Sequence, residues 1–81
     1  MNFYVTMIDK FLSGWGMAKG KKNRLVIRCD TLEQANTVAK NARDRKEMKN
    51  VTVTDKNPYF NPTVNYVSRK LYRELGEVWT K

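Results

Sequence analysis

The sequence predicts an α+β fold, with an antiparallel sheet of three to four strands and one main helix packed across it. Two observations carry this prediction. Several short segments are rich in β-branched and aromatic residues, and one longer stretch repeats apolar residues with the period of a helix. The 81 residues suffice for a modest core, so residues 1–81 are expected to form a single small α+β domain. The expected element order is β-β-α-β-β, with a C-terminal helix as an open question.

Two strands are predicted at the start of the chain. Residues 2–8 alternate so that Phe3, Val5 and Met7 share one face. Residues 24–29 form the second strand, again with alternating apolar residues. The long connection between them predicts a β-hairpin with an extended loop.

Residues 31–45 have the pattern of an amphipathic helix. Asp30 can cap the free backbone N–H groups of the first turn, and Glu33 stands at the capping-box position. The apolar positions follow the helical period, and the alanines among them allow close packing on a sheet. These positions are Leu32, Ala35, Val38, Ala39 and Ala42.

The C-terminal half is expected to add two strands and a stiff loop. Residues 50–54 alternate as a third strand, and residues 64–67 can form a short fourth. Between them, two Asn-Pro pairs flank Tyr59 and Phe60. Because proline disfavours the helical conformation of the residue before it, this segment should be a stiff loop that presents two aromatic side chains. Residues 68–79 fit either a final helix capped by Ser68 or a strand followed by a turn.

A net charge of +8 is the strongest feature of the composition. Such an excess of cations favours contact with nucleic acid, with nucleoprotein or with an acidic protein surface. The alternative is that the charge only keeps a small protein in solution.

The composition argues against an enzyme. The chain has no histidine, so the commonest general base and metal ligand is missing, and its carboxylates are scattered singly. Cys29 has no base to activate it and is expected in the core. No cofactor and no metal are therefore expected. A single cysteine, no secretion signal and no apolar stretch of about 18 residues predict a cytoplasmic protein without a membrane partner.

The stretch from Ser13 to Arg24 is the main candidate for a binding site. It contains three of the four glycines and one of the two tryptophans. An exposed tryptophan beside cations can anchor a protein interface or stack on a base, whereas the alternative is that Trp15 folds back onto the core. The glycine spacing does not match a phosphate-binding loop, and the stretch leads into a strand rather than a helix. The predicted partner-binding residues are Trp15, Lys19, Lys21, Lys22 and Arg24.

Two further basic groups follow along the chain. The first is a secondary basic patch of Arg43, Arg45, Lys46 and Lys49, whose alternative explanation is a solvated helix end balanced by neighbouring carboxylates. The second comprises Arg69, Lys70 and Arg73. If two of these groups meet in space, they form a surface for a polyanion. The aromatic residues Tyr59, Phe60 and Tyr66 could add a platform for single-stranded nucleic acid, or simply complete the core.

One set of residues is distributed along the chain up to about residue 67. It comprises Phe3-Tyr4-Val5-Thr6, Ser13-Gly14-Trp15-Gly16-Met17-Ala18, Gly20-Lys21, Cys29-Asp30, Ala35, Ala39, Asn41-Ala42, Arg45, Met48-Lys49, Val51 and Pro58-Tyr59. In these residues the chain resembles a group of short proteins encoded in bacteriophage and prophage genomes, generally without an assigned activity. The resemblance implies a small phage accessory protein in the cytoplasm of the bacterial host cell. Such proteins often bind and block a host machine, and anti-CRISPR proteins are one class of them.

The favoured hypothesis is a non-enzymatic binding protein that occludes a host nucleoprotein system such as CRISPR–Cas. Its partner would be a host protein or nucleoprotein complex with an acidic or phosphate-rich surface. One alternative is a regulatory protein that binds DNA or RNA directly. Another is a small structural phage protein that oligomerises through its sheet edges.

Overall fold

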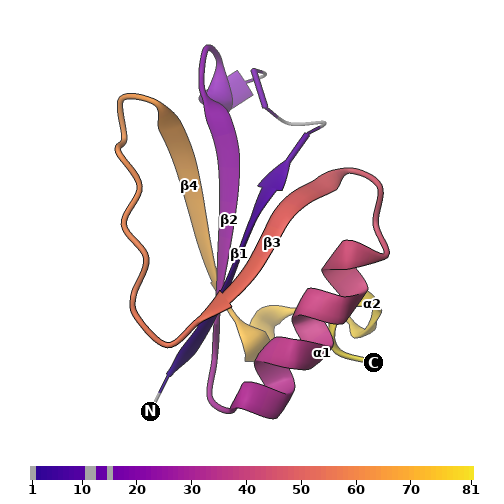
Figure 1. Cartoon of the computed structure of the whole chain (residues 1–81). Helices are drawn as coiled ribbons and strands as arrows, with labels where there is room; N and C mark the ends of the chain where they lie inside the picture. The colour runs from indigo at the N-terminus through magenta and orange to yellow at the C-terminus, as the bar shows by residue number, and fades with distance from the viewer. Residues whose placement is uncertain (1, 11–12, 15) are drawn as a thin grey trace.

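Four strands form one sheet in the order β3-β1-β2-β4, and the helix α1 packs across one of its faces (Figure 1). The computed structural model describes residues 2–10, 13–14 and 16–81. β1 pairs antiparallel with both β2 and β3, whereas β2 and β4 run parallel. The elements are β1 (Phe3–Asp9), the 3-10 turn η1 (Gly16–Ala18), β2 (Lys22–Cys29), α1 (Leu32–Arg43), β3 (Met48–Thr54), β4 (Asn65–Leu71), the 3-10 turn η2 (Tyr72–Glu74) and α2 (Glu77–Thr80).

The α+β class, the β-β-α-β-β order and the single main helix are confirmed. The sheet is mixed, whereas the sequence predicts an antiparallel one. The reason is the path of residues 55–64, which leave the end of β3 and return along the sheet before β4 begins (Figure 1). β4 therefore starts beside the start of β2 and runs in the same direction.

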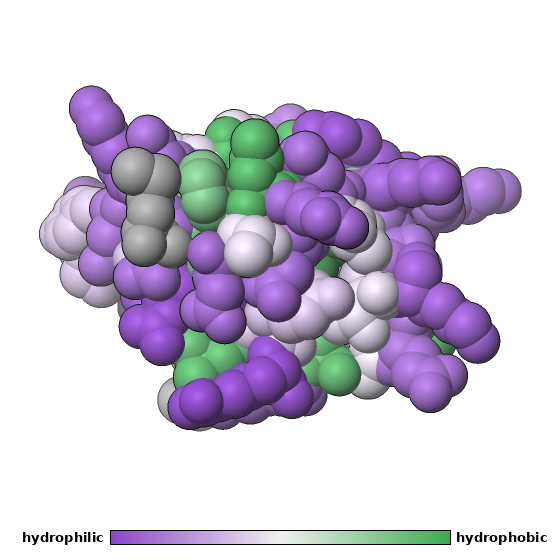
Figure 2. All heavy atoms as spheres, turned by 90° about the horizontal axis from the view of Figure 1, so that it is seen from below, coloured by the Kyte–Doolittle hydropathy of each residue, from purple (hydrophilic) through white to green (hydrophobic). Residues whose placement is uncertain are grey.

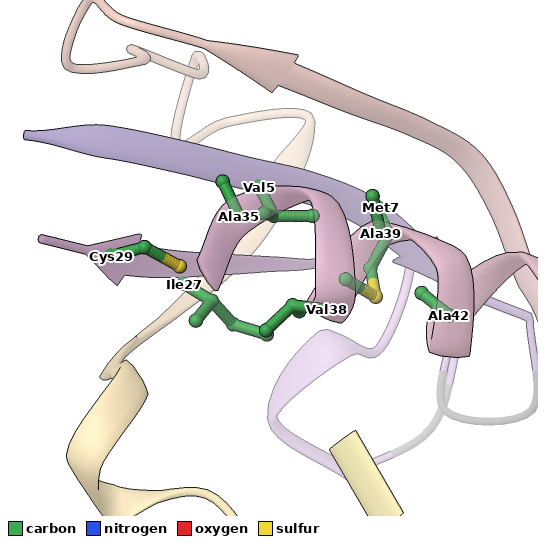
Figure 3. Packing of buried hydrophobic residues seen from close by; sticks show 8 residues of the cluster. All are labelled: Val5, Met7, Ile27, Cys29, Ala35, Val38, Ala39 and Ala42. Carbon is green, nitrogen blue, oxygen red and sulfur yellow. The ribbon is translucent and has the colours of Figure 1, made fainter. Parts of the chain in front are cut away.

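The core lies between α1 and the two central strands. Val5 and Met7 of β1 and Ile27 of β2 are fully buried against the helix, as Figure 3 shows. The alanines on the facing side of α1 have no exposed surface, which lets the helix backbone approach the sheet closely. Each large apolar side chain buried here stabilises the fold by roughly 1.5–3 kcal/mol. The cluster comprises Val5, Met7, Ile27, Cys29, Ala35, Val38, Ala39 and Ala42.

The start of α1 differs from the prediction by one residue. Thr31 is the N-cap, and its hydroxyl accepts a hydrogen bond of 3.1 Å from the backbone N–H of Gln34. The Gln34 side chain in turn accepts a 2.9 Å bond from the backbone of Asp30. The expected Asp30–Glu33 capping pair is therefore wrong, because Cys29 still pairs in the sheet and Asp30 is part of the turn that leaves it. Leu32, expected on the buried stripe, is 48% exposed at the helix end.

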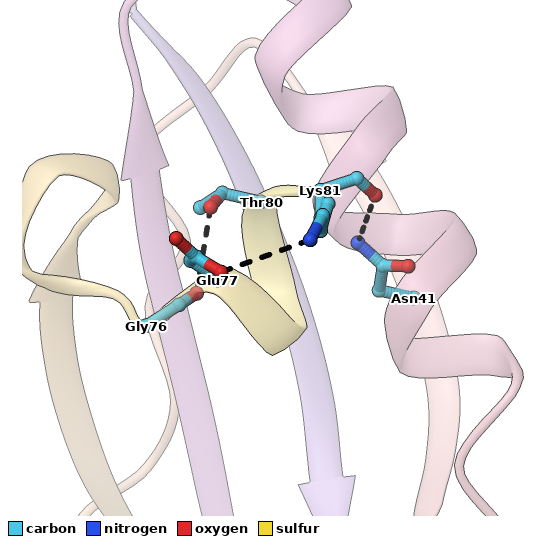
Figure 4. A network of polar contacts seen from close by, with 5 residues as sticks. All are labelled: Asn41, Gly76, Glu77, Thr80 and Lys81. Atoms are coloured by element: carbon cyan, nitrogen blue, oxygen red, sulfur yellow. Dashed lines mark hydrogen bonds and ion pairs between the residues drawn. The ribbon is translucent and has the colours of Figure 1, made fainter.

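Residues 68–79 do not form one helix. Their first part completes β4, and only Glu77–Thr80 is helical, so the alternative of a strand followed by a turn is the better prediction. α2 lies beside α1, where the Asn41 side chain donates hydrogen bonds to the backbone oxygens of Trp79 (2.8 Å) and Lys81 (3.3 Å; Figure 4). The C-terminus thereby adds Leu75 and Trp79 to the side of the core that α1 covers.

The opposite face of the sheet is also partly covered. Thr6 and Val26, which point away from α1, are only 8% and 1% exposed. Arg24 connects this face to the segment of residues 55–64, because its guanidinium lies 4.6 Å from the centre of the Phe60 ring. Arg69 donates hydrogen bonds to the Asn57 side chain (2.9 Å) and to the backbone oxygen of Pro58 (2.6 Å). These contacts hold the stiff loop in place.

Polar side chains cover most of the end of the molecule that Figure 2 shows from below, with small apolar areas between them. Among the helices that the structure describes, none has the length and apolar character required to cross a bilayer.

Candidate polyanion-binding site

The described residues of the connection between β1 and β2 form hydrogen bonds with one another and with the adjoining strands. The Ser13 hydroxyl donates to the backbone oxygen of Asp9 (2.8 Å) and accepts from the backbone N–H of Asn23 (3.0 Å), which ties the two strands together. Gly14 and Gly20 have φ angles of 84° and 73°, in the left-handed region that favours glycine. Ala18, which lies between these two glycines in the sequence, is buried. Lys19 and Lys21 lie on this connection and Lys22 is the first residue of β2, whereas Trp15 lies outside the described residues.

The turn after α1 lies at the same end of the sheet. Asp9 of β1 stands opposite Met48 of β3, so the hairpin loop begins where β3 begins. The backbone N–H of Lys10 donates a 2.8 Å hydrogen bond to the backbone oxygen of Glu47, which joins the loop to the turn directly. Two basic groups that are separate in the sequence therefore converge. We call this the lysine-rich end, made of Lys10, Lys19, Lys21, Lys22, Lys46 and Lys49.

The arginines near this end have structural roles. Arg24 stacks on Phe60 and donates a 3.0 Å hydrogen bond to the Asn65 side chain. Arg45 lies 4.6 Å from the centre of the Trp79 ring and pairs with Glu47 at 3.1 Å. The sequence predicted Arg24 as a partner-binding residue and Arg45 as part of the secondary basic patch, because it shows the charge of each residue but not the ring beside it.

Arg43 makes a weaker contact, at 3.5 Å, with the backbone oxygen of Val51. Among the described residues, the side chains of these six lysines form no hydrogen bond or ion pair. The charge of Lys10 interacts with Glu47, and the other five ammonium groups remain for a partner. Sequence reasoning missed Lys10, although its position directly after a predicted strand places it at the same end as the hairpin loop.

The carboxylates at this end do not cancel the positive charge. The pKa of Glu47 is lowered from its ordinary value of 4.5, first by a hydrogen bond from its own backbone N–H and then by the Arg45 guanidinium. Glu47 is therefore ionised and already paired at neutral pH. Asp9 and Asp44 are the other carboxylates near the six lysines. A compact group of strongly hydrated ammonium ions suits phosphate oxygens, which it contacts as point charges.

The remaining predicted groups lie elsewhere. Arg69 and Lys70 pair with Val26 and Ile27, toward the opposite end of β2, so the third basic group does not join the lysine-rich end. The aromatic platform is not formed, because Phe60 stacks on Arg24 while Tyr66 pairs with Asn23 on the side of the sheet that faces α1. The side chain of Tyr59 is 78% exposed.

Cys29 is buried at the end of β2. Burial, with a smaller contribution from the charge of Asp30, raises the pKa of its thiol to about 11. The thiol is therefore protonated and shielded at neutral pH, which disfavours a nucleophilic role. Within the described ranges, no three acidic or cysteine side chains are grouped so that they could hold a metal ion.

Comparison of the chain with protein-family models, with curated proteins and with solved structures finds no match.

Proposed function

We propose that this is a non-enzymatic binding protein whose lysine-rich end covers a phosphate-rich surface of a nucleoprotein complex. The observation that carries the proposal is the convergence of the hairpin loop and the turn after α1, joined by the bond from Lys10 to Glu47. This convergence concentrates cations that the sequence separates by more than twenty residues. A multivalent cationic surface gains affinity for a polyanion through counterion release.

The chemistry of the side chains supports binding rather than catalysis. The chain has no histidine, and its only thiol is buried with a raised pKa. Lysines dominate the site, and they contact phosphate without reading sequence. Occlusion of a surface needs no more than this.

The resemblance to short phage-encoded proteins suggests the biological setting. A nucleoprotein system of the bacterial host, such as CRISPR–Cas, is the most concrete partner of this kind. At a net charge of +8 the chain would act on the phosphate-rich or acidic parts of such a complex, rather than as an acidic mimic of DNA.

Affinity capture from bacterial lysate tests this proposal. The tagged protein should recover a complex that contains nucleic acid, and the triple variant K19Q/K22Q/K46Q should lose it. A control variant, K56Q/R73Q/K81Q, removes the same charge from exposed positions elsewhere and should retain capture. Recovery of no nucleic-acid-containing complex, or equal recovery by both variants, would contradict the proposal.

Direct binding of free nucleic acid by the same lysines is the second candidate. Among the described residues, Tyr59, Phe60 and Tyr66 form no shared platform for bases, which favours contacts with phosphate. Nuclease treatment of the lysate separates the two candidates. Capture of protein that survives nuclease digestion indicates a protein surface, whereas capture that disappears with it indicates the nucleic acid.

A further inference from the structure

A hollow lies on the face of the sheet that points away from α1, far from the lysine-rich end. Its volume is about 260 Å³. Cross-strand pairing builds it, because Tyr4, Arg28 and Leu71 stand side by side on β1, β2 and β4. Val26, only 1% exposed, forms the apolar floor. The register of the sheet therefore places the floor and three sides of the hollow together.

The rim of the hollow combines a free cation with polar groups held in fixed orientations. Arg28 is exposed, and its side chain forms no hydrogen bond or ion pair among the described residues. Arg69 uses two of its donors to hold Asn57 and Pro58, and its charge remains at the rim. Because arginine can only donate, Asn57 must turn its amide oxygen toward Arg69. Its NH₂ group is then left to donate to a ligand.

We propose that this hollow binds one nucleotide unit, a planar base that carries a phosphate. The base would stack beside the Tyr4 ring over Val26 and Leu71, while the Asn57 amide donates to its edge. Arg28 would hold the phosphate, since a guanidinium matches phosphate oxygens with two parallel donors. The unit can come from a free mononucleotide or from a single-stranded nucleic acid. This site is separate from the lysine-rich end and does not depend on the function proposed for it.

Removal of one carboxylate should strengthen nucleotide binding, whereas removal of the arginine should weaken it. Glu74 also lines the hollow, and its Oε2 accepts a 3.0 Å hydrogen bond from the backbone N–H of Leu71. Its negative charge opposes a phosphate, so Glu74→Gln should strengthen nucleotide binding while keeping an acceptor for Leu71. Arg28→Gln should weaken binding roughly tenfold, as expected for the loss of a hydrogen bond to a charged group.

The experiment is a titration of the isotope-labelled full chain with uridine monophosphate, followed through backbone amide NMR shifts. Saturable shifts at Tyr4, Val26, Arg28 and Leu71, weakened in R28Q and strengthened in E74Q, support the proposal. Binding by uridine monophosphate indicates the free nucleotide as the source. Binding only by a uridine hexamer, with the same dependence on Arg28, indicates a strand. Lys40→Gln, at an exposed position of α1 on the other side of the sheet, serves as the charge-matched control and should leave mononucleotide binding unchanged.

Three results would overturn the proposal that the hollow binds a nucleotide. The first is no saturable shift at these amides with either ligand at millimolar concentration. The second is equal affinity for ribose 5-phosphate, which would show that the hollow does not bind the base. The third is tighter binding of phenyl phosphate, which would assign the hollow to a phosphorylated tyrosine side chain. Tyr4→Leu checks the stacking separately, since it keeps the hollow apolar and should weaken uridine monophosphate binding more than ribose 5-phosphate binding.

Discussion

Replacement of Trp79 by alanine should lower the free energy of unfolding by about 3 kcal/mol. The side chain is partly buried against the core on the α1 side. A tryptophan that loses on the order of 100 Å² of buried surface forfeits about 2.5 kcal/mol at about 25 cal/mol per Å². The stacking of Arg45, 4.6 Å from the ring centre, adds roughly 0.5–1 kcal/mol at this partly exposed site.

A double-mutant cycle with Arg45→Gln isolates the stacking energy. Urea unfolding followed by far-UV circular dichroism gives the stability of each variant without relying on tryptophan fluorescence. We expect a coupling free energy of roughly 0.5–1 kcal/mol between Arg45 and Trp79. Trp79→Phe is the matched control, since it keeps a ring for Arg45 and should lose less stability than Trp79→Ala.

Two outcomes would refute this reasoning. A loss well below about 1 kcal/mol for Trp79→Ala would mean that the C-terminal segment adds little to the core. Zero coupling would mean that Arg45 is not held by the ring. Arg45 would then rejoin the cations that are available to a partner.

Three other predictions concern stability and the loop. Between about pH 9 and 11 the unfolded chain loses the Cys29 proton while the folded chain keeps it. The free energy of unfolding should therefore fall with rising pH by on the order of 2–3 kcal/mol. Urea unfolding measured across this pH range should show no such fall for Cys29→Ala. Ionised Glu47 should add to the free energy of unfolding above pH 4.5, and this contribution should disappear as the pH falls through the lowered pKa of Glu47 in the folded chain. A Glu47→Gln variant with the same acid dependence as the native chain would contradict this. Arg69→Met removes the hydrogen bonds to Asn57 and Pro58 and should lower the stability of the segment of residues 55–64 by roughly 1–2 kcal/mol. Amide exchange and proteolysis of this segment should then become faster. Unchanged exchange would argue against a role of Arg69 in holding it.

Local periodicity predicted the helix face well. Val38 and Ala39 are fully buried because the spacing of apolar residues along α1 fixes which side meets the sheet, whatever the rest of the chain does. The first three strands were recognisable for the same reason. Their alternation is a property of a few neighbouring residues.

The fourth strand shows where local information ends. Ser68, Arg69 and Lys70 are polar residues of an edge strand, so their pattern resembles an exposed helix as much as a strand. Its parallel direction depends on the path of residues 55–64, which no alternation pattern encodes. For the same reason, residues 68–79 fit both a final helix and a strand followed by a turn when judged from the sequence.

The candidate site was predictable only in part. The sequence showed three basic groups, and the meeting of the first two depends on the register of β1 against β3, which brings Lys10 to Glu47. The sequence also could not show that Arg24 and Arg45 lie against Phe60 and Trp79, because these rings are distant along the chain. The sequence shows which side chains are charged, but it does not show which of them are free to contact a partner.

The salt dependence of nucleic-acid binding tests the central claim most directly. Fluorescence anisotropy with a single-stranded oligonucleotide gives the slope of the logarithm of the binding constant against the logarithm of salt concentration. Each phosphate contact contributes about 0.7 to this slope for a single strand, so K19Q/K22Q/K46Q should reduce its magnitude by roughly 2. The control K56Q/R73Q/K81Q should leave the slope close to the native value. An equal change in both variants, or no change in either, would contradict the claim that the lysine-rich end binds phosphate.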